Sequence, residues 1–342
     1  MLKTEELKYI SDEFGLMERL QVIKPLASGD VNSAYQVACG SQKYVIKKIN
    51  KERYVKDYSV ELDKLTQSLL FSEQIAAQLS ETNHVRSAFF TGTDCIVQTK
   101  NELILLYPYL DAIALENHSL STDHVKDIAE FLYQLHHCQL SFDHDFAKKK
   151  FEIYKQLGEK IINLSVWNRM SSLTHPGYFF PTINAIANYL LANKGNLLHA
   201  LENMEGTVLC HNDLKPKNVL WKENYFWVVD WETVGLFDQA ADYLDSLLAW
   251  CTLYNKDGVS MDQGKLRVFM EAYPLPEQAN LAESLNIVLI KWYFWLAFCL
   301  NKLVKNPKKF KSNFWHIRYS INFIVFLING KIISQIENTH SG

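Results

Sequence analysis

The sequence predicts an α+β protein with two lobes, in which a small antiparallel-sheet lobe with one helix precedes a larger, mainly helical lobe. A chain of 342 residues exceeds the size of one small domain. Short apolar runs separated by turn residues fill 21–110, whereas helical periodicity dominates after residue 110. We therefore predict an N-terminal lobe over 1–107 and a C-terminal lobe over 108–342, the latter holding one strand-like hairpin within 207–232.

The first lobe is predicted to be a sheet because its apolar runs are short and are bounded by turn residues. One helix interrupts them over about 60–79, where apolar residues recur at three- and four-residue spacing. These are Leu62, Leu65, Leu69, Ala76 and Leu79.

The second lobe opens with a helix whose apolar face contains Val125, Ile128 and Leu132, and Ser121 or Thr122 is the expected N-cap. Further helical patterns cover about 151–164, 182–203, 236–254 and most of 279–333. The longest strongly apolar runs, 292–300 and 321–328, are shorter than the ~20 residues that span a bilayer, so we expect buried helix faces and no membrane span.

Composition excludes several classes of function. The 35 basic and 38 acidic residues give a net charge of −3, which provides no electrostatic basis for nucleic acid binding. The six cysteines are far apart and form no C-x-x-C pair, so we expect neither a zinc site nor disulfides. The N-terminus lacks an apolar run of signal-peptide length. We therefore expect a cytoplasmic protein.

A dense group of polar residues lies in the hairpin segment, in the order His211, Asp213, Asn218 and Asp230. If the strands on either side of "KEN" pair about Asn224, positions 218 and 230 face each other at neighbouring strand ends. An amide and a carboxylate that converge in this way suit Mg²⁺, whose remaining ligands are commonly nucleotide phosphates. The alternative is a polar hairpin with ordinary surface carboxylates.

Asp213 lies on the loop before these metal ligands, where it could accept the proton of a substrate hydroxyl. His211 is better suited to orienting that loop than to chemistry. The expected reaction is therefore transfer of a phosphoryl group to an alcohol.

The N-terminal lobe supplies candidate nucleotide contacts. "KYVIKKI" is typical of a strand that carries a phosphate-binding lysine, with Lys47 on the same face as Val45, which could cover the base. The neighbouring Lys48 leaves open a solvated lysine on an edge strand. Upstream, "LASGDVNSAYQV" predicts a strand, a turn and a strand, and Ser28, Gly29 and Asn32 could donate to phosphates there.

Glu73 lies on the same helical face as Leu69 and Ala76, so it is predicted to point inward. A buried carboxylate requires a cationic partner, and Lys47 is the expected one. Glu61 and Glu81 are weaker candidates for the same role.

The order of these parts resembles the protein-kinase-like fold, and "HNDLKPKN" is similar to the catalytic loop of eukaryotic protein kinases. Asp230, however, is followed by Trp-Glu and not by Phe-Gly, no A-P-E segment follows, and a long helical region precedes His211. These features resemble the aminoglycoside phosphotransferase and choline kinase family, with its H-G-D-x-x-x-x-N loop and "iDWE" strand. The likeness covers roughly residues 20–250 and is strongest over 207–245.

The resemblance implies that Asp213 is the catalytic base, that Asn218 and Asp230 hold Mg²⁺, and that Lys47 binds the phosphates of ATP or GTP with Glu73 as its partner. Lys215 stands where relatives more often have His or Gln, and it would add positive charge near the transferred phosphoryl group. Pro108 lacks an N–H, so the base would be read by the backbone of Tyr109 or Leu110. Asp242 matches a family Asp that we expect to be structural.

The expected function is thus an ATP-dependent phosphotransferase for a small hydroxyl compound of the aminoglycoside, choline or ethanolamine, amino-acid alcohol or sugar type. Residues after 250 include 11 Lys and Arg against 6 acidic residues, which weighs against polycationic acceptors. Trp292, Trp295 and Trp315 suggest a cage for a quaternary ammonium, although aromatic residues at helical spacing are more often core. Alternatives are an atypical protein Ser/Thr kinase and a catalytically silent binding module. We expect a monomer or homodimer.

Overall fold

The computed structural model describes residues 2–26, 32–58, 61–82, 84–171, 180–255, 258–277, 279–305 and 310–340. Their contacts divide the chain into two compact units. Unit 1 comprises Met1–Leu115, Leu140–Asp143 and Lys217–Val234, and unit 2 comprises Glu116–Gln139, His144–Pro216 and Gly235–Gly342. The sheet lobe and the helical lobe that the sequence predicts are both present.

Unit 1 is built on a five-stranded antiparallel sheet in the order β1-β2-β3-β5-β4. Its strands are β1 (Gln21–Pro25), β2 (Asn32–Cys39), β3 (Gln42–Asn50), β4 (Val97–Gln98) and β5 (Glu102–Pro108). The central strand β3 pairs with β2 on one side and with β5 on the other. Residues on β3 are therefore held along the whole strand.

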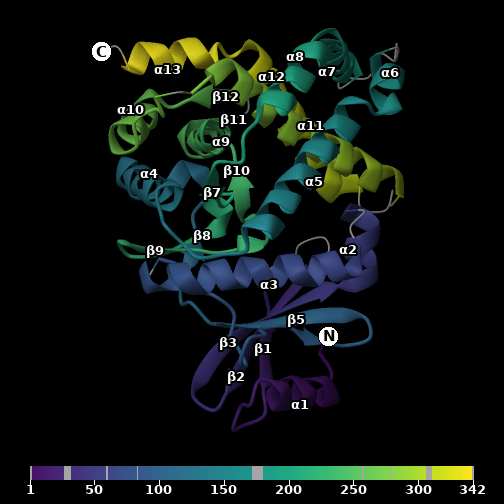
Figure 1. Ribbon diagram of the computed structural model, residues 1–342, viewed down its shortest axis with the longest axis vertical. Helices are drawn as coiled ribbons and strands as arrows, with labels where there is room; N and C mark the ends of the chain where they lie inside the picture. Colours follow the sequence, from purple (N-terminus) through teal and green to yellow (C-terminus); the bar gives the residue numbers. More distant parts are fainter. Residues whose placement is uncertain are drawn as a thin grey trace. The chain divides into compact units, whose positions relative to one another are not determined.

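Two helices cover opposite faces of this sheet (Figure 1). Helix α3 (Leu62–Leu79) agrees with the predicted 60–79 helix, and its Leu65 and Leu69 pack with Ile49, Leu103 and Leu105 on one face. Helix α1 (Thr4–Glu13), which sequence periodicity did not reveal, covers the other face. The short helix α2 (Lys51–Tyr58) follows β3.

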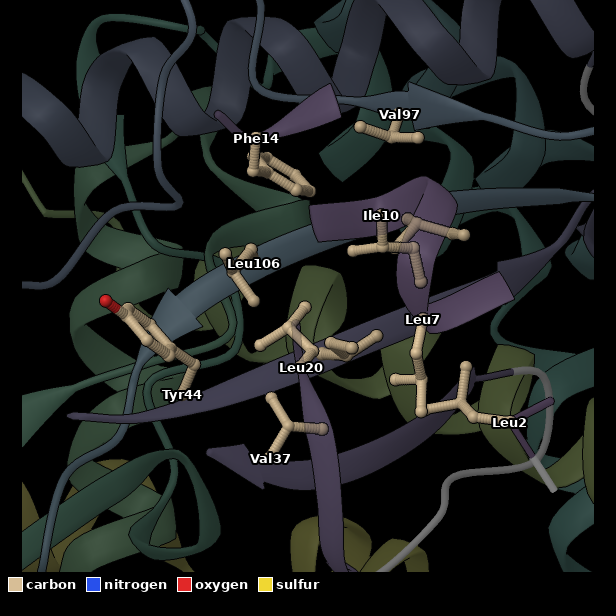
Figure 2. Packing of buried hydrophobic residues seen from close by; sticks show 11 residues of the cluster. Leu2, Leu7, Ile10, Phe14, Leu20, Val37, Tyr44, Val97 and Leu106 are labelled. Atoms are coloured by element: carbon tan, nitrogen blue, oxygen red, sulfur yellow. The ribbon is translucent and has the colours of Figure 1, made fainter. Parts of the chain in front are cut away.

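Figure 2 shows the packing of α1 on the sheet, where Leu7, Ile10 and Phe14 meet Val37 and Leu106. Alternation along β3 explains the two cores, because Ile46 faces α1 while Ile49 faces α3. Lys48 shares the α1 face, where its ammonium lies 2.5 Å from Glu6 and 2.6 Å from Glu102. Lys48 is thus occupied by structural ion pairs, and Lys47 points to the other face.

The hairpin of β8 (Val219–Lys222) and β9 (Tyr225–Val228) belongs to unit 1, although we predicted it within the second lobe. Strand β6 (Ile113–Ala114) pairs with β8, so unit 1 also extends beyond the predicted boundary at residue 107. The His84 ring stacks on the Phe226 ring, with 4.1 Å between the ring centres, and the His84 carbonyl accepts from the Val228 N–H at 2.8 Å. These contacts anchor the hairpin.

Unit 2 is mainly helical (Figure 1). Its helices are α4 (Thr122–His136), α5 (His144–Ile162), α6 (Ser165–Ser171), α7 (Phe180–Ala192), α8 (Lys194–Asn203), α9 (Gln239–Cys251), α10 (Gln263–Ala272), α11 (Leu281–Lys305), α12 (Phe310–Asn329) and α13 (Ile332–His340). Ser121 caps α4 as predicted, since its side chain accepts from the His124 N–H.

Short strands complete unit 2. Strand β7 (Val208–Cys210) pairs with β10 (Gly235–Phe237), and β11 (Thr252–Asn255) pairs with β12 (Gly258–Met261). The β11–β12 hairpin and α10 were not predicted, because the helical pattern of 236–254 runs into β11 and no strong periodicity marks 263–272.

Over Leu281–Leu303, helix α11 is long enough and apolar enough to cross a membrane, with a mean hydropathy of 1.3. Half of that segment is buried within the protein, where α11 packs against α5, α8, α9 and α12. This is also how the core helix of a globular unit behaves.

Candidate active site

The register of the β8–β9 hairpin differs from the prediction by one residue. Val219 faces Val228 and Lys222 faces Tyr225, so a two-residue turn at Glu223 and Asn224 joins the strands. Glu223 adopts a left-handed conformation with φ of 55°, which a tight hairpin turn requires. Asn218 is therefore aligned with position 229 and not with Asp230 as predicted.

Asn218 and Asp230 nevertheless lie at the same end of the hairpin. Asn218 ends the 3₁₀ turn Pro216–Asn218 and is buried, and its carbonyl accepts from the Val229 N–H at 2.9 Å. Asp230 follows with φ of 67° and ψ of 57°, a left-handed conformation that turns the chain out of the strand. Both side chains offer oxygen ligands of the kind that Mg²⁺ prefers.

Lys47 on β3 contacts the end of this hairpin. Its ammonium lies 2.7 Å from Asp230 Oδ1 and 2.5 Å from Glu232 Oε1. Burial alone would lower the pKa of Lys47, but Glu232 and Asp230 outweigh it and raise that pKa, so the lysine carries its charge at neutral pH. The lysine predicted to bind phosphate and the Asp predicted to bind metal are thus brought together.

Asn32, at the start of β2, joins this cluster by donating from Nδ2 to Glu232 Oε1 at 3.1 Å. Its Oδ1 atom is buried and makes no hydrogen bond within the described part of the chain. Ser28 and Gly29, the other predicted donors of the turn, lie outside the described residues. Sequence reasoning did not assign Glu232 a role, and only its place two residues after Asp230 could have suggested one.

Glu73 is buried as predicted, but its predicted ion pair with Lys47 is wrong. Its two carboxylate oxygens accept from the Tyr107 hydroxyl at 2.6 Å and from the Ala88 N–H at 2.7 Å. Burial raises the pKa of Glu73, and these hydrogen bonds offset the rise only in part. Among the described residues, Lys47 pairs with Asp230 and Glu232 and not with Glu73. The segment that follows β9 brings these two carboxylates to the lysine.

The residues expected to contact the base are Val45 on β3, and Tyr109 and Leu110, which follow the end of β5. Val45 is half-buried and faces Tyr107 in the β3–β5 ladder. The Tyr109 N–H donates to the Lys43 carbonyl at 3.1 Å, so it is occupied by the sheet. Of the two backbone N–H groups predicted to bind the base, only that of Leu110 therefore remains a prediction.

The loop that follows β7 in unit 2 carries the other predicted residues. His211 is fully buried, and its Nδ1 accepts from the Asp213 N–H at 3.3 Å, which agrees with an orienting role. The Trp250 indole donates to the Leu214 carbonyl at 2.9 Å and fixes the far side of the loop.

Lys215 forms an ion pair with Asp213, with 2.8 Å between Nζ and Oδ1. Burial lowers the pKa of Lys215, but Asp213 and Asp245 raise it by more, so the ammonium is retained at neutral pH. The same ammonium lies 5.5 Å from the centre of the Trp292 ring. The loop therefore presents a carboxylate and a cation side by side.

A buried hydrogen-bond network supports this loop. His136 Nε2 lies 3.0 Å from Asp242 Oδ2, and His136 Nδ1 lies 2.8 Å from the Tyr273 hydroxyl, which also accepts from Gln239. Burial acts to raise the pKa of Asp242, yet the hydrogen bond from His136 brings a net lowering. Asp242 is thus placed as a structural residue should be.

Cys210 completes a cluster with His136 and Asp242 in which ligand atoms lie within 4.8 Å of one another. Such a set could hold a metal by distance alone. Hydrogen-bond distances join its members, with 3.0 Å between His136 Nε2 and Asp242 Oδ2 and 3.5 Å between Cys210 Sγ and His136 Nε2. We interpret the cluster as hydrogen-bonded support for the loop.

A second buried pair was missed from the sequence. Lys291 of α11 lies 2.6 Å from Asp245 of α9 and donates to the Asn212 carbonyl at 3.1 Å. The available signals were a lone lysine in the apolar segment "NIVLIKWYFW" and an Asp one helical turn after Asp242.

Comparison with known proteins identifies the family of the chain. The description "Phosphotransferase enzyme family" belongs to the family model that matches residues 22–262. No curated protein matches the sequence significantly. Similar solved structures include a spectinomycin phosphotransferase in complex with ADP and spectinomycin, with 16% identity, 96% of this chain and 98% of that chain covered, and a TM-score of 0.62.

Two choline kinase relatives are also similar. The choline kinase from Streptococcus pneumoniae has 14% identity, coverage of 91% of this chain and 98% of its own, and a TM-score of 0.54. A choline/ethanolamine kinase family protein from Mesorhizobium loti has 15% identity, coverage of 99% and 98%, and a TM-score of 0.56. At these identities the likeness shows the protein-kinase-like fold, and the family match shows the membership. The chain belongs to the phosphotransferase enzyme family and is a small-molecule kinase.

Proposed function

We propose that the protein transfers the terminal phosphoryl group of ATP, or of GTP, to a hydroxyl group of a small molecule with the help of Mg²⁺. The observation that carries the proposal is the 2.7 Å contact between Lys47, the cation proposed to bind phosphate, and Asp230, the carboxylate proposed to bind the metal. Asp230 is 43% exposed at its side chain, so a ligand has access to it.

The proposed metal site consists of the Asn218 amide oxygen and the Asp230 carboxylate. Oxygen ligands from only two side chains leave room for phosphate oxygens and water, which is the usual coordination of Mg²⁺ in kinases. When bound, Mg²⁺ would neutralise charge on the phosphates. Lys47 would then hold phosphate oxygens, and Glu232 would keep the lysine ammonium in place.

In unit 2, Asp213 would accept the proton of the acceptor hydroxyl as that oxygen attacks phosphorus. The phosphorus–oxygen bond to the acceptor forms as the bond to the leaving ADP breaks. Lys215, 2.8 Å from Asp213, would stabilise negative charge on the transferred group. His211 would hold the loop by accepting from the Asp213 N–H.

The nucleotide part of the proposal is tested by thermal unfolding. At about 100 times its dissociation constant, Mg·ATP is expected to add about 2.7 kcal/mol to the free energy of unfolding. The measurement is the melting temperature with ATP in Mg²⁺, and with ATP in EDTA as control. An identical melting temperature with and without Mg·ATP and Mg·GTP would instead favour a silent binding module.

The acceptor site is proposed to favour compounds without net positive charge. The Lys215 ammonium already lies over the Trp292 ring, where a quaternary ammonium would otherwise bind. The other suggested cage residues have different partners, since Trp295 stacks on Phe298 and Trp315 stacks on Tyr319. The carboxylate of Asp245 is paired with Lys291 and is not available to a cation.

We therefore expect neutral sugars and zwitterionic amino acids with a hydroxyl group, such as homoserine, to stimulate ADP release more than choline or polycationic aminoglycosides do. A coupled assay of ADP release over such a panel measures this, with nucleotide concentration held constant. Preferential stimulation by choline or by an aminoglycoside would show that the acceptor proposal is wrong while leaving the kinase reaction intact.

A further inference from the structure

We propose that Lys291 is a positioning residue, which sets the direction of the Asp213 side chain by holding the peptide unit that precedes it. The inference rests on the proposed role of Asp213 as the catalytic base. Lys291 lies on α11, beyond the residues 22–262 that the family model matches. The helix that carries it therefore lies outside the part of the chain that the family model matches.

The peptide unit between Asn212 and Asp213 is held at both of its polar atoms. Its oxygen, the Asn212 carbonyl, accepts from Lys291 Nζ at 3.1 Å. Its nitrogen, the Asp213 N–H, donates to His211 Nδ1 at 3.3 Å. A rotation of this peptide would break both hydrogen bonds together, so its orientation is fixed.

This peptide requires such support because Asn212 has φ of 64°, in the left-handed region that non-glycine residues seldom adopt. Asn tolerates that conformation better than most residues but does not enforce it. The conformation of Asn212 determines where the following Cα of Asp213 places its carboxylate. A contact that holds the Asn212 carbonyl thus controls the aim of the proposed base.

Lys291 itself is fixed by charge and burial. Its ammonium lies 2.6 Å from Asp245 Oδ2, and the side chains of Lys291 and Asp245 are 15% and 6% exposed. The Phe237 ring lies on another side, with its centre 5.5 Å from Nζ. Burial alone would lower the pKa of Lys291. The carboxylates of Asp245, Asp242 and Asp213 raise that pKa by more than burial lowers it, so the cation persists at neutral pH.

A contribution to stability does not by itself explain the Lys291–Asp245 ion pair. Ion pairs removed from water contribute little net stability compared with apolar residues of similar size. With a neutral residue at 245, a hydrophobic residue at 291 would suit the apolar face of α11 equally well. The lysine supplies what a hydrophobic residue cannot, which is a donor directed at the Asn212 carbonyl.

The test uses the double variant Lys291→Met with Asp245→Asn, which removes both charges and leaves no isolated buried ion. Hydrogen exchange of peptides that cover 209–216 is measured by mass spectrometry in the full chain. We expect the loop amides to exchange about tenfold faster or more than in the wild type. Hydrolysis of Mg·ATP by water is measured in parallel, and kcat is expected to fall about tenfold or more with little change in KM for ATP.

Lys265→Met is the matched control. Lys265 is also a buried lysine of unit 2, and it donates to the Asn117 carbonyl at 3.2 Å, away from the loop. This variant should leave exchange of 209–216 unchanged. Unchanged loop exchange in a double variant that unfolds cooperatively would overturn the inference. If the wild type transfers the phosphoryl group neither to water nor to any acceptor of the panel, the proposed function fails, but the exchange experiment still decides the role of Lys291.

Discussion

Replacement of Asp213 by Asn is expected to lower the rate of phosphoryl transfer by about 10²–10⁴-fold, the usual contribution of a general base. Asn has nearly the same shape but cannot accept the proton of the acceptor hydroxyl. Because the change lies in the chemical step, KM for ATP should change little. The measurement is steady-state ADP release in the presence of a saturating acceptor.

Asp145→Asn, at the exposed start of α5 in the same unit, is the control for the loss of a carboxylate. It should retain wild-type activity, and both variants should unfold cooperatively. Full activity in a folded Asp213→Asn variant would mean that the base lies elsewhere.

Replacement of Asp230 by Asn is the second change with a large expected effect, a loss of about 10²-fold or more in kcat. The variant replaces the one charged ligand of the proposed metal site with a neutral amide, and it removes one of the two carboxylates that pair with Lys47. The stabilisation by ATP should then depend much less on Mg²⁺, which a magnesium titration of the melting temperature would measure.

The matched control is Asp111→Asn, because Asp111 forms an exposed ion pair at 3.1 Å with Lys222 on the same hairpin. Surface pairs of this kind contribute little, so activity and magnesium dependence should persist. An Asp230→Asn variant with the same magnesium dependence as the wild type would contradict the proposed metal site.

The sequence was most informative where a short motif coincided with a strong periodic pattern. Helix α3 and the central strand β3 follow from such patterns, and so does the inward direction of Glu73. The spacing of Asn218 and Asp230 also placed both at one end of a hairpin. Their alignment was wrong by one residue because turn length cannot be read from "KEN" alone, and Glu223 proved able to adopt a left-handed turn conformation.

Contacts between distant segments were less predictable. Glu73 was expected to pair with Lys47 because a buried carboxylate requires a cationic partner and Lys47 was the expected one. The Tyr107 hydroxyl and the Ala88 N–H satisfy it instead, and neither residue carries a charge that marks it in the sequence. Glu232 pairs with Lys47 although the two residues are 185 positions apart in the sequence, and Lys291 donates to the Asn212 carbonyl over a separation of 79 positions.

The hairpin was assigned to the wrong unit for a similar reason. Its position between helical segments suggested the helical lobe, but His84 and β6 hold it in unit 1 through stacking and strand pairing. Such pairings depend on the tertiary fold, so the local pattern of the hairpin contains no information about them.

The destination of the phosphoryl group tests the central claim most directly. The protein is incubated with Mg²⁺, ATP labelled at the γ-phosphate and a panel of sugars, amino-acid alcohols, choline, ethanolamine and aminoglycosides, and the labelled products are then separated. We predict that label appears on a small hydroxyl compound with the wild type and not with Asp213→Asn. Label that appears only on polypeptide, or equally with both proteins, would contradict the account.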